Sequence, residues 1–371
     1  MENISFSIVV ATKGRVSLLI DLMESIYIAR SNYKGNCEVL IIDDSSEREN
    51  EEIQKACRKF DCIYYYFKNT VSAKRNYGGR QARNEVILFL DSDCIATEHI
   101  LERYAEKYNG EKVAAVAGPL EFVGTDTWFW KAIEATPYLT CFYLPKYVPK
   151  LEWGVTANFS TRREVFLQVG GFDESFRRPA GEDVDLGLMI RDAGYDINGS
   201  PEALVYHSKK TWIPFKSMVR RLNFYGTADC DLINKHPERG EIVLPKRSYL
   251  YVIYTILIII ASFASKKWLL LLAIPVIIIL ENVVMSLLVN KMSSEKKATL
   301  SQQLMAQFLI HDSESAYLRR CIRTRNIAGM KKQMIYYLGQ YNGMLNIGSY
   351  NTWVEYGSLA LIIILTLLTI I

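Results

Sequence analysis

The sequence is poor in the features that mark several classes of protein. Its 371 residues contain only four histidines and seven cysteines, and no two cysteines form a Cys-x-x-Cys pair. An odd number of irregularly spaced cysteines, with no secretory signal ahead of them, favours reduced thiols in the cytosol over disulfides or structural zinc. Repeats and low-complexity tracts are also missing, and neither half has the composition of a collagen or a disordered chain.

The chain also lacks a strong excess of charge of one sign. It has 44 Lys and Arg against 40 Asp and Glu, so the formal net charge is +4. Residues 291–332 alone carry nine basic and three acidic side chains, a charge of +6, which leaves −2 for the rest. We therefore predict no nucleic-acid partner, because the basic residues lie in one segment beside apolar runs. That arrangement is typical of contact with anionic membrane lipids.

Long apolar runs occur in the last third of the chain. Tyr249–Ala264 and Trp268–Val289 predict a transmembrane hairpin with both ends in the cytosol, and the uncharged end of the chain predicts a third span. We expect a multi-pass protein of the cell membrane whose soluble domain lies in the cytosol. The predicted organisation is an α/β domain over 1–247, a transmembrane hairpin over 248–289, a basic interfacial segment over 290–352 and a third transmembrane helix over 353–371.

Two details of this membrane part have alternative explanations. Glu281 and Asn282 interrupt the second predicted span, where a charge is costly unless it is paired. Contact with a second copy of the chain or with a lipid carrier is one explanation, and packing against a neighbouring span is the other. The basic segment also contains apolar residues at helical spacing, which suit an interfacial helix or a helix packed on the soluble domain; they are Met334, Tyr337, Leu338, Tyr341 and Leu345.

The first part of the chain alternates short strands and helices about 25 residues apart, which predicts βαβ units and a mostly parallel sheet. The expected strands are Phe6–Ala11, Glu38–Ile42, Ile63–Phe67 and Val86–Leu90, and the expected helices are Val16–Arg30, Glu51–Phe60 and a loop and helix over 72–84. Polar residues follow three of these strands, at Thr12, at Asp44, and at Asp91 with Asp93. Ligands bind at this edge of open α/β sheets.

Asp91 and Asp93, separated by one residue, follow a strand that is expected to be buried. Two such carboxylates can share a divalent cation that also takes diphosphate oxygens, since Mg²⁺ and Mn²⁺ prefer oxygen ligands. An acidic helix cap is the alternative explanation.

Glu182 and Asp183 precede a helix expected over Gly187–Asp192, and an acid there can act as general base on a hydroxyl. Helix capping is again the alternative, and Asp185 suits it better than Asp183 does. His207 follows a strand expected over 204–206. It completes a metal site or serves a structural role.

Seven motifs occur in order over about the first 245 residues. They are SIVVATKGR at the start, LIIDDSS (40–46), AKRNYGGRQA (73–82), LFLDSD (88–93), NFSTRREVFLQVGGFDE (158–174), GEDVDLGLMIRDAGY (181–195) and VYH (205–207). This ordered set resembles the family-2 glycosyltransferases of the GT-A fold. The resemblance implies a Rossmann-like α/β catalytic domain that uses a nucleotide-sugar donor and Mn²⁺ or Mg²⁺.

Carried over residue by residue, the resemblance first implies a donor site. Thr12, Asp44 and Arg75 are implied to line the nucleotide pocket, with Asp44 on the base. Gly170 and Gly171 are implied to let the backbone approach the donor sugar closely.

The resemblance also implies the residues of the reaction itself. Asp93 is implied to be the principal metal ligand, with Asp91 near the ribose and metal, and His207 occupies a position that joins the metal site in related enzymes. Asp183 is implied to be the catalytic base, and Glu182 to orient the acceptor or the sugar.

The chain departs from the family pattern in two places. Ala11 replaces the usual proline of the opening motif, which is a mild change. The Gln and Trp of the QxxRW motif of processive synthases are absent, although Arg220 and Arg221 remain at that position to contact diphosphate or a lipid headgroup, or to form a basic membrane-facing surface. Three spans are also few for a polymer channel, so we expect transfer of a single sugar.

The sequence therefore predicts an inverting, metal-dependent glycosyltransferase that acts on a lipid-linked or membrane-bound glycan acceptor. A UDP-sugar suits Asp44 and Arg75, although guanosine donors occur in the same family. A processive polysaccharide synthase and a catalytically degenerate membrane scaffold are the alternatives. A sugar-nucleotide pyrophosphorylase is disfavoured because its glycine-rich opening loop with a basic end is missing, and a transporter because some 245 soluble residues precede the first span.

Overall fold

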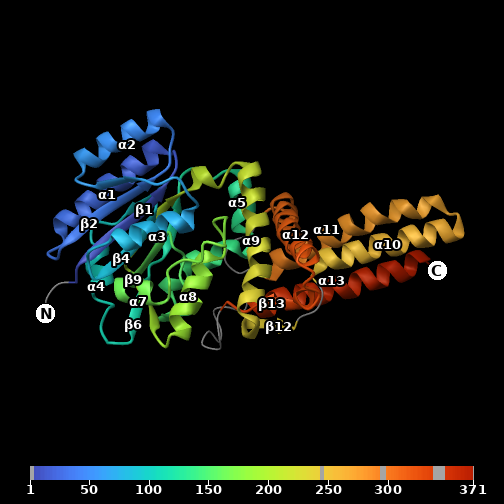
Figure 1. Cartoon of the computed structure of the whole chain (residues 1–371). Coiled ribbons are helices and arrows are strands. Elements are labelled where there is room, and N and C mark those ends of the chain that lie inside the picture. Colours follow the sequence, from blue (N-terminus) through green and yellow to red (C-terminus); the bar gives the residue numbers. More distant parts are fainter. Residues whose placement is uncertain (1–3, 243–245, 293–297, 337–346, 371) are drawn as a thin grey trace. The chain divides into compact units, whose positions relative to one another are not determined.

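A computed structural model describes residues 4–242, 246–292, 298–336 and 347–370 (Figure 1). The chain divides into two compact units. The first comprises the residues up to 125 and 139–212, together with 336, and the second comprises 126–138, 213–335 and the described residues after 346.

The first unit is built on an eight-stranded sheet with the order β3-β2-β1-β4-β9-β6-β10-β8. Strands β1 to β4 are parallel and in close register, so that Val10 of β1 lies between Ile41 of β2 and Leu90 of β4. The bounds are β1 Phe6–Thr12, β2 Cys37–Asp43, β3 Ile63–Tyr66, β4 Val86–Asp91, β6 Val113–Ala117, β8 Lys150–Leu151, β9 Asn158–Arg162 and β10 Asp196–Gly199. The predicted mixed α/β fold with a mostly parallel sheet is confirmed.

Strand β9 was not predicted, and it is the main exception to the parallel order. It runs antiparallel between β4 and β6, and its Asn158, Ser160 and Thr161 are fully buried. Buried polar side chains need hydrogen-bond partners. Asn158 has them, because its Nδ2 donates to the carbonyls of Pro119 (2.9 Å) and Ala203 (2.7 Å). Because the strand is rich in polar residues, a search for apolar runs does not find it.

Helices cover the sheet (Figure 1), and the buried residues of α1 and α2 are mostly apolar, among them Leu19, Leu22 and Ile53. The N-terminus of α2 is fixed by a capping box, in which Ser46 and Glu49 satisfy each other's backbone N–H groups. The N-terminus of α3 is fixed by Thr70, whose Oγ1 accepts from the Ala73 N–H at 3.3 Å. The bounds in this unit are α1 Val16–Asn32, α2 Glu47–Lys59, α3 Val71–Gln81, α4 Ile100–Ala105, α6 Thr140–Tyr143, α7 Arg163–Gln168 and α8 Glu182–Asp192.

A second, three-stranded sheet with the order β5-β11-β7 carries His207. Its strands are β5 Cys94–Ala96, β7 Leu120–Val123 and β11 Val205–Ser208. His207 therefore lies within β11 and not after it, opposite Cys94 of β5 and Phe122 of β7. The predicted strand began one residue too early and ended two residues too early.

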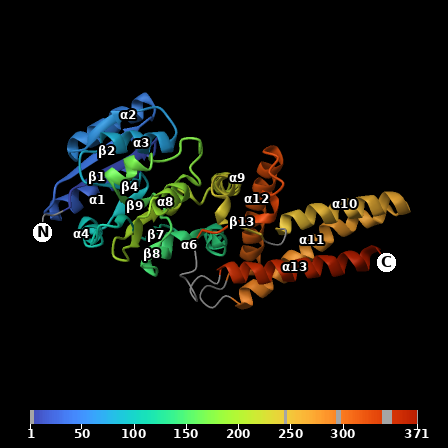
Figure 2. The ribbon, with the colours of Figure 1, turned by 60° about the horizontal axis from the view of Figure 1, so that its bottom comes forward.

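The second unit is almost entirely helical. Figure 2 shows α10, α11 and α13 side by side, with α12 across them. The bounds are α5 Trp128–Glu134, α9 Phe215–Lys235, α10 Arg247–Ser265, α11 Ala273–Met292, α12 Leu300–Arg323 and α13 Ile347–Ile370, with a small hairpin of β12 Gly240–Ile242 and β13 Lys332–Met334. Met334 is therefore in a strand and not in the predicted amphipathic helix. The other residues of that prediction, 337, 338, 341 and 345, lie outside the described residues.

Two segments of this unit, Arg247–Ser265 and Trp268–Val289, are long and apolar enough to cross a membrane, on length and composition alone. The apolar part of α13, Tyr356–Thr369, is shorter. Glu281 is fully buried on α11 and accepts hydrogen bonds from Tyr251 and Ser358. The charge in the second predicted span thus has partners within its own chain.

Candidate active site

Asp44 and Lys74 lie in contact at the carboxyl ends of β1 and β2. Lys74 donates from Nζ to Asp44 Oδ1 and to the backbone oxygen of Thr12, both at 2.6 Å. Lys13 Nζ lies 3.5 Å from the other Asp44 oxygen. Burial lowers the pKa of Lys74, and the Asp44 carboxylate acts against that shift. Lys74 was missed by the sequence analysis, although it stands beside Arg75 in the same motif.

Arg75 connects two acidic segments that are far apart in the sequence. Its Nη2 donates to Asp91 Oδ1 at 2.8 Å and its Nη1 donates to Glu182 Oε1 at 2.9 Å. Only 5% of Arg75 is exposed, so these charge-assisted hydrogen bonds lie in a region of low dielectric constant. The predicted contact of Arg75 with the nucleotide stays a prediction, whereas its contact with Glu182 was not predicted at all.

Glu182 and Asp183 form the first turn of α8, which begins five residues earlier than predicted. Gly181 precedes the helix with φ +87°, in a backbone region that favours glycine. The cap position is therefore Gly181, and the capping role considered for Asp185 is wrong because Asp185 lies inside the helix. A helix N-terminus favours negative charge, so this is a suitable place for two carboxylates.

Burial is the main cause that raises the pKa of both carboxyl groups above their ordinary values. For Glu182 the charge of Asp183 raises the pKa further, while Arg75 opposes the rise. For Asp183 the hydrogen bond from the Val184 N–H, at 2.9 Å, opposes it. A carboxylate with a raised pKa is a stronger base, which suits proton abstraction.

Asp93 lies just after β4, where three elements converge on it. Arg15 Nη1 is 3.0 Å from Oδ2, and Thr211 donates from Oγ1 to the same oxygen at 2.8 Å. His207 Nε2 lies 3.6 Å from Oδ1, and both Asp93 and His207 are buried. The structure thus brings together the two residues that were predicted as metal ligands from positions more than 100 residues apart.

This group fits a divalent cation. In the described part of the chain, Asp93, Cys94 and His207 place one ligand atom each within 4.8 Å of one another. The Cys94 thiol donates to the Ala157 carbonyl at 3.8 Å, and Mn²⁺ and Mg²⁺ prefer oxygen to sulfur ligands, so Asp93 and His207 are the better pair. Asp91 is outside this group and contacts Arg75, so its role at the metal stays a prediction.

Gly170 and Gly171 follow α7 with φ values of +90° and +71°. A Cβ on Gly171 would lie 2.6 Å from Asn76 Oδ1, whereas a Cβ on Gly170 would meet nothing within 4 Å among the described residues. Asn76 holds the next residue through two 2.8 Å hydrogen bonds, from the Phe172 N–H and to the Phe172 carbonyl. Gly171 thus has a packing reason to be glycine, and the predicted approach of this backbone to a sugar stays a prediction.

These two glycines make a matched pair for mutation. Gly171→Ala is expected to lower the free energy of unfolding by about 2–4 kcal/mol, through backbone strain and disruption of the Asn76 contacts. Gly170→Ala is expected to cost only about 1–2 kcal/mol, from backbone strain alone. Denaturant titration of both variants measures the difference, and equal losses would contradict the role assigned to Asn76.

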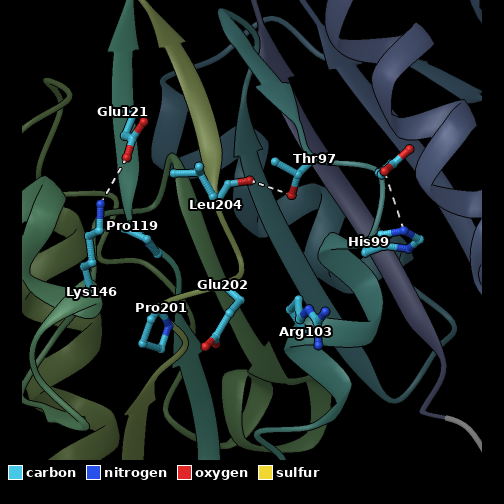
Figure 3. A pocket seen from close by; sticks show the side chains of 10 residues that line it. Thr97, His99, Arg103, Pro119, Glu121, Lys146, Pro201, Glu202 and Leu204 are labelled. Carbon is cyan, nitrogen blue, oxygen red and sulfur yellow. Dashed lines mark hydrogen bonds and ion pairs between the residues drawn. The ribbon is translucent and has the colours of Figure 1, made fainter.

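Two further features are the arginine pair that was predicted to contact a diphosphate and a hollow in the first unit. Arg220 and Arg221 belong to α9 in the second unit, so their contact with a diphosphate stays a prediction. A hollow of about 630 Å³ opens beside Thr97, Glu121, Lys146 and Leu204 (Figure 3). Its Lys146 and Glu121 form an ion pair at 3.2 Å, and Leu204 immediately precedes β11. The residues that line the hollow include none of the acidic groups described above.

Comparison with known proteins identifies the family to which the chain belongs. The family described as "Glycosyltransferase like family 2" matches residues 19–235, more than half of the chain, so the chain belongs to this family. The match includes most of the motifs quoted above, and together with the mostly parallel sheet it confirms the predicted GT-A class of fold. The chain thus contains a family-2 glycosyltransferase domain.

Curated relatives carry glycosyltransferase names. The chain is 27% identical over 199 residues to "Glycosyltransferase AglE" of Haloferax volcanii, covering 51% of this chain and 61% of that protein. It is 25% identical over 217 residues to "Pre-mycofactocin glycosyltransferase" of Mycobacterium tuberculosis, covering 54% and 43%. The match thus spans about half the length of these relatives.

Two solved structures are also similar at low identity. One is S. aureus TarS, with a TM-score of 0.43 and 15% identity, covering 64% of this chain and 43% of that one. The other is GalNAc-T7 with UDP, GalNAc and Mn²⁺, with a TM-score of 0.42 and 16% identity, covering 56% and 43%.

Proposed function

We propose that this protein transfers one sugar from a nucleotide-sugar donor, with a UDP-sugar favoured, to a lipid-linked glycan acceptor at a membrane, with inversion at the anomeric carbon. The observation that carries the proposal is the buried Arg75, which joins the Asp91 end of β4 to the acidic N-terminus of α8 in a family-2 chain. The carboxylates predicted to bind donor and acceptor are thus linked through one side chain.

The reaction needs one displacement. Asp183 takes a proton from the acceptor hydroxyl as that oxygen attacks the anomeric carbon on the face opposite the leaving nucleoside diphosphate. Glu182 Oε2 is buried, and no hydrogen-bond partner for it lies among the described residues, so it is placed to accept a hydroxyl of the acceptor or the sugar. No covalent intermediate is required.

A divalent cation, Mn²⁺ or Mg²⁺, is proposed as cofactor. Asp93 and His207 would hold it, on the basis of the buried carboxylate–imidazole pair described above. When bound, the ion would neutralise negative charge on the diphosphate leaving group. Lys74 and Arg75 add fixed positive charge on the donor side of the same sheet edge.

The second unit supports a membrane location and a lipid-linked acceptor. The exposed apolar side chains of α10 and α11 form surfaces that water solvates poorly, and both helices are long enough to span a bilayer. We place the catalytic domain on the cytosolic side, because the basic segment at 291–332 follows the hairpin. An enzyme anchored in this way is suited to a lipid-linked acceptor and to anionic lipids around it. A processive synthase and a degenerate scaffold are the competing proposals.

A donor screen tests the proposal. The purified full chain, with Mn²⁺ or Mg²⁺, is expected to release nucleoside diphosphate from at least one UDP-sugar or GDP-sugar, and a chelator is expected to stop the release. Asp93→Ala is expected to reduce the rate to background. Glu121→Ala in the separate hollow is the matched control and is expected to keep full activity.

The outcomes of the screen distinguish the alternatives. Turnover that adds a single sugar to a lipid-linked acceptor supports the proposal, whereas products of many sugars favour a processive synthase. Absence of turnover with every donor favours a scaffold. Full activity of Asp93→Ala contradicts the metal assignment.

A further inference from the structure

Two cysteines of the second unit lie in direct contact. Cys230 is on α9 and Cys321 is on α12, and their Sγ atoms are 3.2 Å apart. Both side chains are fully buried. The sulfur atoms of a disulfide are about 2.05 Å apart, so these two need to approach by only about 1 Å to form a bond.

The two helices hold the cysteines at this separation because they pack very closely. A Cβ on Gly226, one turn before Cys230, would lie only 2.0 Å from the backbone oxygen of Ser313 on α12. The glycine therefore lets the two backbones come together where a larger residue would separate them. Helices this close leave little freedom for the side chains between them.

Polar contacts on both sides of the cysteines fix the register of α9 against α12. Arg319 donates from Nη2 to Asn223 Oδ1 at 2.7 Å, nearer the start of α9. Arg320 donates from Nε to Asp231 Oδ1 at 2.8 Å, beside Cys230. The two helices run in the same direction, since higher numbers on α9 meet higher numbers on α12. A change of register would break these contacts, so the sulfur atoms stay in contact.

The surroundings make the two thiols unequal. The hydrogen bond with Cys230 is the main cause that lowers the pKa of Cys321, and the nearby Lys246 lowers it further. Lys246 Nζ lies 4.4 Å from the ring centre of Tyr317, one turn before Cys321 on α12. The thiolate is the reactive form of cysteine, so the positive charge of Lys246 near Cys321 makes that sulfur the better attacker and Cys230 the resolving one.

We propose that Cys230 and Cys321 are a reversible oxidation site, at which hydrogen peroxide converts the two thiols into a disulfide that links α9 to α12. The Cys321 sulfur attacks one peroxide oxygen, the O–O bond breaks, and the departing oxygen leaves as water after taking up a proton. The Cys230 sulfur then attacks the oxidised Cys321 sulfur, the S–S bond forms, and the S–O bond breaks with release of a second water. The two thiols lose two electrons and two protons, and the peroxide is reduced to two waters.

Burial of the pair limits which oxidant reaches it. Hydrogen peroxide is small and uncharged, whereas bulky disulfide reagents require the helices to separate. The bond would close a loop from residue 230 to residue 321 that contains both candidate membrane spans. A cross-link over a long loop stabilises the folded chain by restricting the unfolded one.

The test counts thiols in the purified full chain. After treatment with hydrogen peroxide, the protein is denatured and alkylated, and its mass and peptides are measured. Five of the seven cysteines are expected to be alkylated, with a mass loss of about 2 Da before alkylation and a linked peptide that contains Cys230 and Cys321. A dithiol reductant is expected to restore all seven thiols. The melting temperature is expected to rise on oxidation and to fall again on reduction.

Variants make the assignment specific. Cys230→Ala is expected to abolish the linked peptide and to leave Cys321 as a sulfenic or sulfinic acid. Cys57→Ala, at a buried cysteine of the first unit, is the matched control and is expected to retain the linked peptide. Circular dichroism checks that each variant folds, and the peptide map of the unmodified sequence decides the linkage even if one does not. Seven alkylated thiols after peroxide, or a linked peptide from another pair, would overturn the proposal.

Discussion

Asp183→Asn is expected to reduce sugar transfer by about 10²–10⁴-fold, the usual contribution of a general base, while leaving the donor Kd unchanged. The amide has nearly the shape of the carboxylate and can still accept from the Val184 N–H, so the helix N-terminus is preserved. Only the ability to take up a proton is lost. The defect should therefore appear in the rate with saturating donor and not in donor binding.

The pH dependence provides a second readout of the same assignment. A base must be deprotonated to act, and the pKa of Asp183 is raised by burial, so the rate of the unmodified enzyme is expected to rise with pH through that raised pKa. Asp183→Asn should lose this rise. Asp192→Asn, at the exposed end of the same helix, is the matched control and should keep both rate and profile. A near-normal rate for Asp183→Asn would show that another group is the base.

Arg75→Met is expected to lower the free energy of unfolding by about 3–5 kcal/mol, because it leaves the buried Glu182 carboxylate without its partner, while the partly exposed Asp91 adds less. Transfer should be lost as well, since Asp91 and Glu182 would no longer be held together. Arg75→Lys keeps the charge but replaces a two-pronged donor with a single ammonium group, so it should rescue stability only in part. Denaturant titration and the transfer assay measure the two effects.

The free energy of unfolding of the unmodified protein should also depend on pH. Because the folded-state pKa of Glu182 lies above its ordinary value, folded chains hold a proton that unfolded chains release between those two values. Stability therefore falls as pH rises through this window. Arg75 opposes the rise in pKa, so Arg75→Met should extend the window to higher pH. Arg80→Met, at an exposed position on α3, is the control, and equal losses in the two variants would contradict the bridging role.

The sequence predicts the first half of the fold well because the apolar strands β1, β2 and β4 carry a clear pattern. Asp93 and His207 were paired through a family motif, and the structure places them 3.6 Å apart. The predicted start of α8 was five residues too late because glycine is typical of loops. The positive φ of Gly181 instead lets the helix begin at the next residue, Glu182.

Other contacts depend on the folded arrangement. The contact between Arg75 and Glu182 joins residues 107 positions apart, and local sequence patterns do not report such a distance. Lys74 was missed because nothing in its neighbourhood shows that its side chain reaches back to β1 and β2.

Helix α3 fixes the distance between two regions that are predicted to bind substrate, one at Asp44 and the other at Glu182. Its consecutive residues Lys74 and Arg75 reach in different directions, one to Asp44 and the other to Glu182. Cβ atoms on Gly78 and Gly79 would lie 2.4 Å from Val9 and 2.5 Å from Phe166, so the helix lies against its neighbours with no room to slide. The spacing between the two regions is therefore set in advance by the scaffold. We expect this fixed spacing to select donors by the distance between their base and sugar, because Asp44 is predicted to contact the base and Glu182 the sugar or the acceptor.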